Sequence, residues 1–148
     1  MEYVNIMEVE ILTAKIRETI GTRFHYGGRV VGLRGGIDCA GILVWSLHQL
    51  GYTIYDKPFY NRGDVLTDMT EVLQNNTFFQ KGEGETFSGG DVILIRTTEI
   101  YHHLVYYTED ETIIHAWVTS GVNKVVESTM LPEWYNSIHS IWRFGDLE

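Results

Sequence analysis

The chain has 148 residues, is 44% hydrophobic and carries a formal net charge of −9 at pH 7. This acidic balance argues against binding to nucleic acids, which reward clustered Lys and Arg, and against attraction to anionic surfaces. The first residues lack a basic segment followed by an apolar one, and no apolar run approaches the ~20 residues of a membrane span, so we expect cytoplasmic synthesis without a signal peptide and no membrane insertion.

Helical patterns dominate the first half of the chain. Four apolar residues at helical spacing predict a helix over roughly 8–20: Val9, Leu12, Ile16 and Ile20. The density of glycine over 21–37 predicts a loop. A second helix is predicted over 39–50 with Asp38 as its N-cap. A third helix is predicted to start at Asp64.

The second half of the chain is rich in β-branched and aromatic residues. Polar turns divide it into five segments that we expect to be strands: 91–96, 102–108, 112–117, 123–128 and 138–144. Helices followed by strands predict an α+β fold with an antiparallel sheet. No repeat or linker interrupts the chain, so we expect residues 1–148 to form a single domain.

Cys39 is the only cysteine in the chain, so it has no partner for an intramolecular disulfide. It stands at the start of the second predicted helix, where free backbone N–H groups and the helix dipole favour a thiolate. His103 and His115 follow later in the chain and can serve as a base and as the group that orients this base. A thiol, a base and an orienting group in this order predict a cysteine-nucleophile hydrolase.

The two histidines lie on neighbouring strands of one predicted hairpin. A turn centred on Glu109 would place His103 and His115 directly opposite each other, about 4.5–5.5 Å apart at Cβ. Only an odd-numbered loop brings both side chains to one face of the sheet. His102 would point to the other face, although a shift of one residue would exchange its role with that of His103.

A metal site is the weaker interpretation of these residues. Cys39, His102, His103 and His115 lack the Cys-x-x-Cys or His-x-x-x-His spacing of common metal sites. We therefore expect no metal ion and no cofactor. His25 is left without an assigned role, although it stands next to Tyr26.

Five short motifs follow one another in a fixed order. They are Tyr26-Gly27-Gly28, Asp38-Cys39-Ala40-Gly41-Ile42-Leu43, Gly90-Asp91-Val92, His103-Leu104-Val105-Tyr106-Tyr107 and Ile114-His115-Ala116. They resemble the Tyr-x-Gly-Gly, D-C-S-G-L, G-D-L, H-V-G-I-Y and I-H-A motifs of the NlpC-type cell-wall cysteine peptidases, which are papain-like. The first motif lacks the intervening residue, and Ala40 replaces the usual Ser.

Further segments resemble the phage and prophage branch of this family, whose members are described as cell-wall peptidases of the tail-assembly region. The stretch Gly21-Thr22-Arg23-Phe24-His25-Tyr26-Gly27-Gly28-Arg29 is similar to G-T-P-F-H-H-Q-G-R, with Arg23 in place of Pro. Tyr60-Asn61-Arg62 and Trp142-Arg143-Phe144 are similar to the Tyr-x-Arg and R-F segments of that branch. The resemblance covers about residues 8–145.

The resemblance implies a papain-like fold and hydrolysis of peptidoglycan stem peptides, between D-γ-glutamyl and a diamino acid. It assigns Cys39 as nucleophile, His103 as base and His115 as the third catalytic member, with Tyr26 lining the site near the thiol. We expect a thiolate–imidazolium pair as the starting state. The Cys39 backbone N–H and the Tyr26 hydroxyl are candidate oxyanion donors.

Three other residues are candidates for substrate binding. Arg29 and Arg62 have guanidinium groups that suit substrate carboxylates, and Trp117 follows His115 at the same face of its strand. Asp38 is expected to act as the N-cap rather than in the chemistry.

Two alternatives remain open beside the peptidase. One is another thiol hydrolase on the same fold, an amidase or an acyltransferase, and the other is a non-enzymatic component of tail assembly. We expect no separate cell-wall-binding domain, so phage tail proteins are the expected partners and incorporation into a virion the expected destination.

Overall fold

The computed structural model describes residues 8–56, 71–74, 79–81, 86–97, 102–119 and 121–145. Two helices, α1 (Val9–Arg17) and α2 (Cys39–Gln49), lie in the first half of the chain. The hairpin strands β1 (Arg29–Val30) and β2 (Gly36–Ile37) stand between them. These helices match the predictions over 8–20 and 39–50. The helix predicted from Asp64 lies mostly outside the described residues, of which 71–74 form a helical turn.

An antiparallel sheet of six strands follows, in the order β3-β8-β4-β5-β6-β7. Its strands are β3 (Phe79–Lys81), β4 (Asp91–Arg96), β5 (His102–Tyr107), β6 (Ile113–Thr119), β7 (Val122–Ser128) and β8 (Ile138–Phe144). A 3-10 helix, Pro132–Asn136, precedes β8. The expected α+β fold with an antiparallel sheet is confirmed, and β3 and the 3-10 helix are additions to the prediction.

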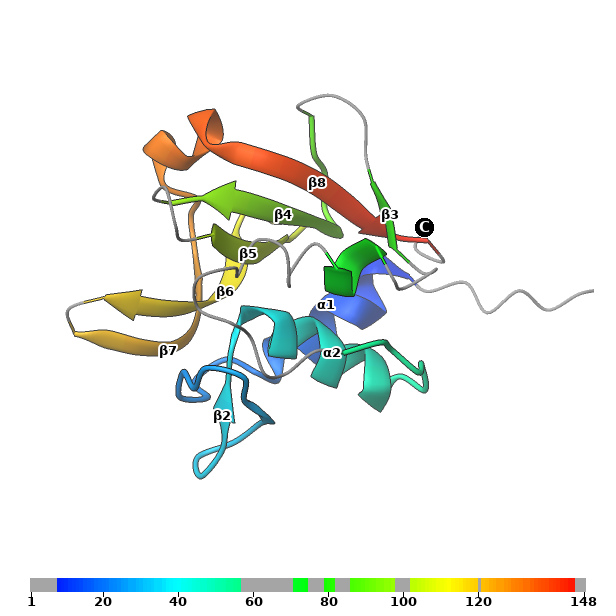
Figure 1. The fold of residues 1–148 in the computed structure, drawn as a ribbon, viewed down its shortest axis with the longest axis vertical. Coiled ribbons are helices and arrows are strands. Elements are labelled where there is room, and N and C mark those ends of the chain that lie inside the picture. The colour runs from blue at the N-terminus through cyan, green and yellow to red at the C-terminus, as the bar shows by residue number, and fades with distance from the viewer. Residues whose placement is uncertain are drawn as a thin grey trace, which may run out of the picture.

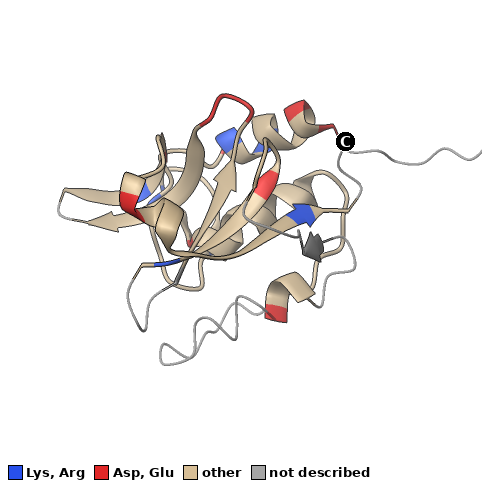
Figure 2. Ribbon diagram, turned by 90° about the horizontal axis from the view of Figure 1, so that it is seen from above, with Lys and Arg blue, Asp and Glu red and all other residues tan. Residues whose placement is uncertain are grey.

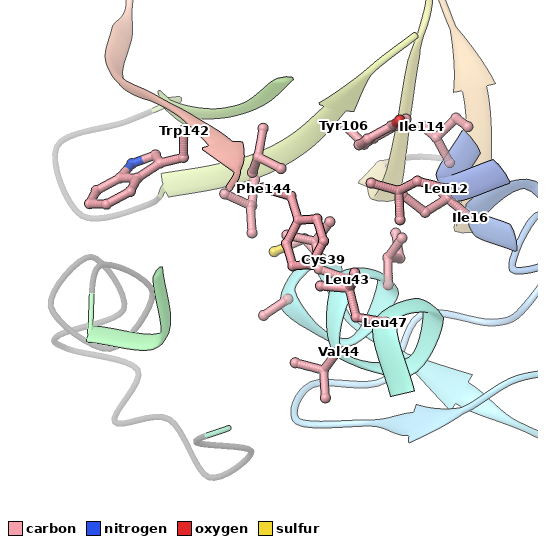
Figure 3. Close-up of a cluster of buried hydrophobic side chains, with 14 of the residues drawn as sticks. Leu12, Ile16, Cys39, Leu43, Val44, Leu47, Tyr106, Ile114, Trp142 and Phe144 are labelled. Carbon is pink, nitrogen blue, oxygen red and sulfur yellow. The ribbon is translucent and has the colours of Figure 1, made fainter. Parts of the chain in front are cut away.

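Helices α1 and α2 cover one face of the sheet (Figure 1). Their apolar residues meet the side chains that β4, β5, β6 and β8 turn toward them, as the cluster around Leu12, Leu43 and Tyr106 shows (Figure 3). The other face buries a second cluster that includes Ile93, Val105 and Trp134. Strands β4 and β5 are thus buried on both sides, because successive residues of a strand point to opposite faces.

Strands β5 and β6 pair only next to their turn. The register pairs Tyr106 with Ile114 and Tyr107 with Ile113. Beyond this point β6 continues with β7 alone, through seven pairs that end at Thr119 and Val122. The first half of β5 is therefore without a β6 partner.

Salt bridges link the β5–β6 turn and β7 to helix α1. The turn is acidic and lies near the basic residues of α1 (Figure 2). The Arg17 guanidinium binds Asp110 at 2.8 Å and holds Glu127 of β7 with two hydrogen bonds of 2.9 Å. This contact ties α1 to two parts of the sheet that are far apart in the sequence.

The predicted loop over 21–37 contains short backbone pairings that anchor it. The Phe24 N–H donates to the Asn123 carbonyl, and the Val125 N–H donates to the Thr22 carbonyl, so this segment runs along the edge of β7. Gly28 packs closely against the β2 backbone. A Cβ atom at this position would lie 2.6 Å from the Gly36 carbonyl carbon.

We expect Gly28→Ala to destabilise the protein by about 2–3 kcal/mol, because the added methyl group meets rigid backbone rather than a flexible side chain. Urea unfolding followed by circular dichroism measures the change. Val30→Ala is the matched control, since Val30 is 62% exposed on the same hairpin and should cost less than about 0.5 kcal/mol. Equal midpoints for the two variants would contradict the packing argument.

Candidate active site

Cys39 begins helix α2, and the carboxylate before it caps the helix. Asp38 has extended backbone, and its Oδ1 accepts a hydrogen bond of 2.8 Å from the Gly41 N–H. The predicted N-cap is confirmed. The Cys39 backbone N–H has no acceptor among the residues that the structure describes, so it points out of the helix start as a free donor.

The same carboxylate binds the glycine-rich loop. Asp38 Oδ2 accepts from the Gly27 N–H at 2.8 Å, and Oδ1 also accepts from Arg29 Nη1 at 2.8 Å. Arg29 makes two further hydrogen bonds of 2.8 Å to Asp56 and one to the Gly28 carbonyl. The guanidinium that was expected to meet substrate carboxylates is therefore engaged inside the protein, where it joins the loop to the helix start.

Tyr26 belongs to this anchored loop. It directly precedes Gly27, its ring packs against the helix-side core, and its hydroxyl oxygen is buried. Tyr26 is therefore next in sequence to Gly27, whose N–H binds Asp38. Asp38 in turn directly precedes Cys39.

The Cys39 sulfur meets strand β5 where this strand has no β6 partner. Backbone hydrogen bonds from Leu104 and Ala40 stabilise its ionised form. Leu104 follows His103 directly in β5. The helix start thus approaches β5 at Leu104, the sequence neighbour of the predicted base. Leu104 faces the helices, whereas the His103 ring lies against Trp134 on the other face, and no direct contact joins Cys39 to either histidine among the described residues.

His103 and His115 are in direct contact. His103 Nε2 lies 2.6 Å from His115 Nδ1, both residues are buried, and their ring centroids are 4.9 Å apart. The odd-numbered loop and the shared face are confirmed. The expected direct opposition is wrong, because the loop runs from Thr108 to Thr112 and the register centres on Asp110.

The reason for this shift lies in the turn itself. Glu111 adopts a left-handed conformation with φ 62°, and the Thr108 N–H donates to the Thr112 carbonyl at 2.8 Å. The Thr108 hydroxyl accepts from the Asp110 N–H, which closes a five-residue loop instead of the expected three-residue one. The two histidines are consequently offset by two positions and meet diagonally, which is within reach of long side chains.

Three further side chains surround the histidine pair. The ring of Trp117, predicted to lie beside His115, is 5.3 Å from it between centroids. Trp134 lies 5.4 Å from His103, and the Ser128 hydroxyl lies 3.0 Å from His115 Nε2. The sequence interpretation missed Trp134 and Ser128. The pairing of β6 with β7 is the signal that could have found Ser128, because it places this residue diagonally from His115.

Burial sets the protonation of the three central groups. It raises the pKa of the Cys39 thiol to about 12, and the Asp38 charge adds to this rise. It lowers the pKa of His103 to about 3, with the His115 charge adding to the fall, and that of His115 to about 4. Desolvation therefore favours the neutral thiol and neutral imidazoles over the expected thiolate–imidazolium pair.

Some predicted residues are not placed. Arg62 lies outside the described residues, and His102 belongs to β5 but its side chain is not described. His25 is exposed in the loop. Within the described ranges, no group of three or more His, Cys, Asp or Glu could hold a metal ion. None of the helices described there is long and apolar enough to cross a membrane.

The histidine pair predicts a loss of stability at acidic pH. On unfolding below pH 6.5 both imidazoles take up protons, whereas the folded pKa values are about 3 and 4. The stability is present above pH 6.5 and falls toward pH 4, by up to about 1.4 kcal/mol per pH unit for each histidine. Between pH 4.5 and 6.5, the free energy of unfolding measured in urea should change less steeply with pH for His115→Gln than for wild type.

His48→Gln is the control for this experiment, because His48 is exposed on α2. Its slope should equal that of the wild-type protein. A His115→Gln slope that matches both would contradict the assignment of His115 as a buried neutral group.

Solved structures of other proteins share this fold. Similar solved structures include the P60 domain of an antigen from Mycobacterium avium subspecies paratuberculosis, with 17% identity, a TM-score of 0.59 and 93% coverage of both chains. The NlpC/p60 domain of the peptidoglycan hydrolase SagA has 17% identity and a TM-score of 0.60, with 91% of this chain and 97% of that one covered.

A third similar structure is the peptidoglycan hydrolase RipB from Mycobacterium tuberculosis, with 16% identity, a TM-score of 0.60 and 93% of this chain covered. The match spans only 64% of the RipB chain. These likenesses confirm the papain-like fold. A comparison with curated protein sequences finds no match. The model of the NlpC/P60 family matches residues 21–143, and the chain therefore belongs to this family.

Proposed function

We propose that the protein is a cysteine endopeptidase that hydrolyses peptidoglycan stem peptides, between D-γ-glutamyl and a diamino acid. The observation that carries the proposal is the position of Cys39 at the capped start of α2, near the Leu104 backbone of the strand that also holds His103, which is paired with His115. Similar structures are named peptidoglycan hydrolases, which supports the substrate class. The choice of bond rests on the motif resemblance.

The proposed roles of His103 and of the Cys39 backbone follow from which of their nitrogen atoms bond no other described residue. His103 Nε2 is occupied by His115, while His103 Nδ1 bonds none of the described residues and is the nitrogen that takes the thiol proton in the proposed mechanism. Transfer of this proton to Nδ1 leaves a thiolate that attacks the amide carbonyl. The free Cys39 N–H is placed to donate to the oxyanion, with the Tyr26 hydroxyl as a second candidate.

The remaining steps return the site to its starting state. Protonated His103 gives its Nδ1 proton to the leaving amine, and the acyl group stays on sulfur as a thioester. His103 then takes a proton from water, which attacks the thioester, breaks the C–S bond and releases the acid product. The freed sulfur takes this proton back from His103, which restores the neutral thiol and imidazole. His115 orients His103 throughout. Trp117 and Arg62 remain candidates for contacts to the substrate.

We expect the wild-type protein to release new amino termini at the diamino acid when it is incubated with purified muropeptides, as read by mass spectrometry. Cys39→Ala should lower the rate by a factor on the order of 10³ or more, because the nucleophile is lost. His48→Gln, an exposed change on the same helix, should leave the rate unchanged.

Other products would decide between the alternatives. Separation of sugar from peptide would indicate an amidase, and transfer of the acyl group to an added amine an acyltransferase. Absence of any product on every wall type tested would favour the non-enzymatic tail component.

We further propose that the protein is made in the cytoplasm and incorporated into a phage or prophage tail, with tail proteins as partners. The similarity of residues 21–29 to the phage branch supports this proposal. Mass spectrometry of purified virions should detect the protein in the tail fraction. Its recovery only from the host lysate, and never from virions, would contradict the proposal.

A further inference from the structure

His115 contacts a polar side chain beyond the three proposed catalytic residues. Its Nδ1 lies 2.6 Å from His103 Nε2, and its Nε2 lies 3.0 Å from the Ser128 hydroxyl. Both ring nitrogens of His115 are therefore in use. The three side chains form one chain of hydrogen bonds that ends at Ser128.

Strand pairing fixes the position of this hydroxyl. His115 pairs with Val126, and Ser128 stands two residues further along β7, so its side chain lies diagonally on the same face. Glu127, the neighbour of Ser128, is held by Arg17 and by the Thr112 hydroxyl at 2.6 Å. This end of β7 is therefore held to α1 and to the β5–β6 turn through Glu127, and the next residue along the strand presents its hydroxyl to His115.

Protonation of His103 requires a particular tautomer of His115. A neutral imidazole has one donor and one acceptor nitrogen. Once His103 has taken the thiol proton, both of its nitrogens carry hydrogen, and its Nε2 donates to His115 Nδ1. His115 then carries its own hydrogen on Nε2. Among the described residues, the acceptor available to this N–H is the Ser128 hydroxyl.

We infer that Ser128 is a positioning residue, whose hydroxyl accepts from His115 Nε2 and holds His115 in the tautomer that can receive a hydrogen bond from protonated His103. The inference rests on the proposed function, because it assumes that the S–H bond of Cys39 breaks and an N–H bond forms at His103 Nδ1. Ser128 does not touch the reacting atoms and acts through His115.

Removal of the Ser128 hydroxyl leaves two alternatives for His115, and both disfavour protonated His103. If His115 keeps its hydrogen on Nε2, the buried N–H loses its acceptor, which costs free energy. If the hydrogen moves to Nδ1, it faces the Nε2 hydrogen of protonated His103. In either case less thiolate forms.

Nitrogen NMR of the protein labelled with ¹⁵N-histidine tests the tautomer directly. The wild-type His115 should show a protonated Nε2 and an unprotonated Nδ1, and Ser128→Ala should shift both signals toward a mixture of tautomers. Ser128→Thr keeps a hydroxyl and should restore the wild-type signals. Ser46→Ala is the control, since the buried Ser46 hydroxyl bonds none of the described residues.

Alkylation of Cys39 by iodoacetamide at pH 7 gives the second measurement. Ser128→Ala should slow it about five- to tenfold, which corresponds to the loss of one ordinary hydrogen bond. Ser128→Thr should stay within about twofold of wild type, and Ser46→Ala should match it. Hydrolysis of muropeptides should lose kcat with an unchanged KM.

The two proposals can fail separately. Neither the nitrogen signals nor the alkylation rate requires peptidoglycan, so a wild-type protein that cleaves no muropeptide would overturn the proposed function alone. Wild-type nitrogen signals together with a wild-type alkylation rate in Ser128→Ala would overturn the role of Ser128.

Discussion

The site depends on the carboxylate of Asp38, which binds three separate parts of the chain. It accepts from the Gly41 N–H at the start of α2, from the Gly27 N–H and from the Arg29 guanidinium. An anionic cap satisfies a free helix N–H and interacts favourably with the helix dipole. Because Cys39 is the next residue, these contacts also set where the thiol lies. Gly41 completes the motif, since a Cβ there would lie 2.5 Å from the Gly28 carbonyl oxygen.

Elements with strong local signals could be predicted from the sequence. The second helix and the strands over 91–96 and 138–144 match α2, β4 and β8 to within one residue, because a cap, a glycine stop and β-branched runs mark them. Strand β3 escaped prediction because it is short and exists by pairing with β8. The register of β5 and β6 depends on a left-handed glutamate, which no apolar pattern signals.

The site was predictable in its residue types and less so in its environment. Cys39, His103 and His115 could be named together because their order and the parity of the hairpin are readable in the sequence. The engagement of Arg29 depends on Asp56, which is distant in the sequence. Burial, and with it the direction of the three pKa shifts, follows from packing by segments such as the 3-10 helix that carries Trp134.

Burial works against ionisation of the proposed catalytic groups, while it strengthens the interactions that favour ionisation. Desolvation favours the neutral forms of the Cys39 thiol and the His103 imidazole. A neutral thiol is a poor nucleophile and resists oxidation. In the same low-dielectric surroundings, the hydrogen bonds from Leu104 and Ala40 to sulfur and the acceptor offered by His115 are worth more than in water. The proposed reaction would depend on these few hydrogen bonds, because they favour the charged pair that burial opposes.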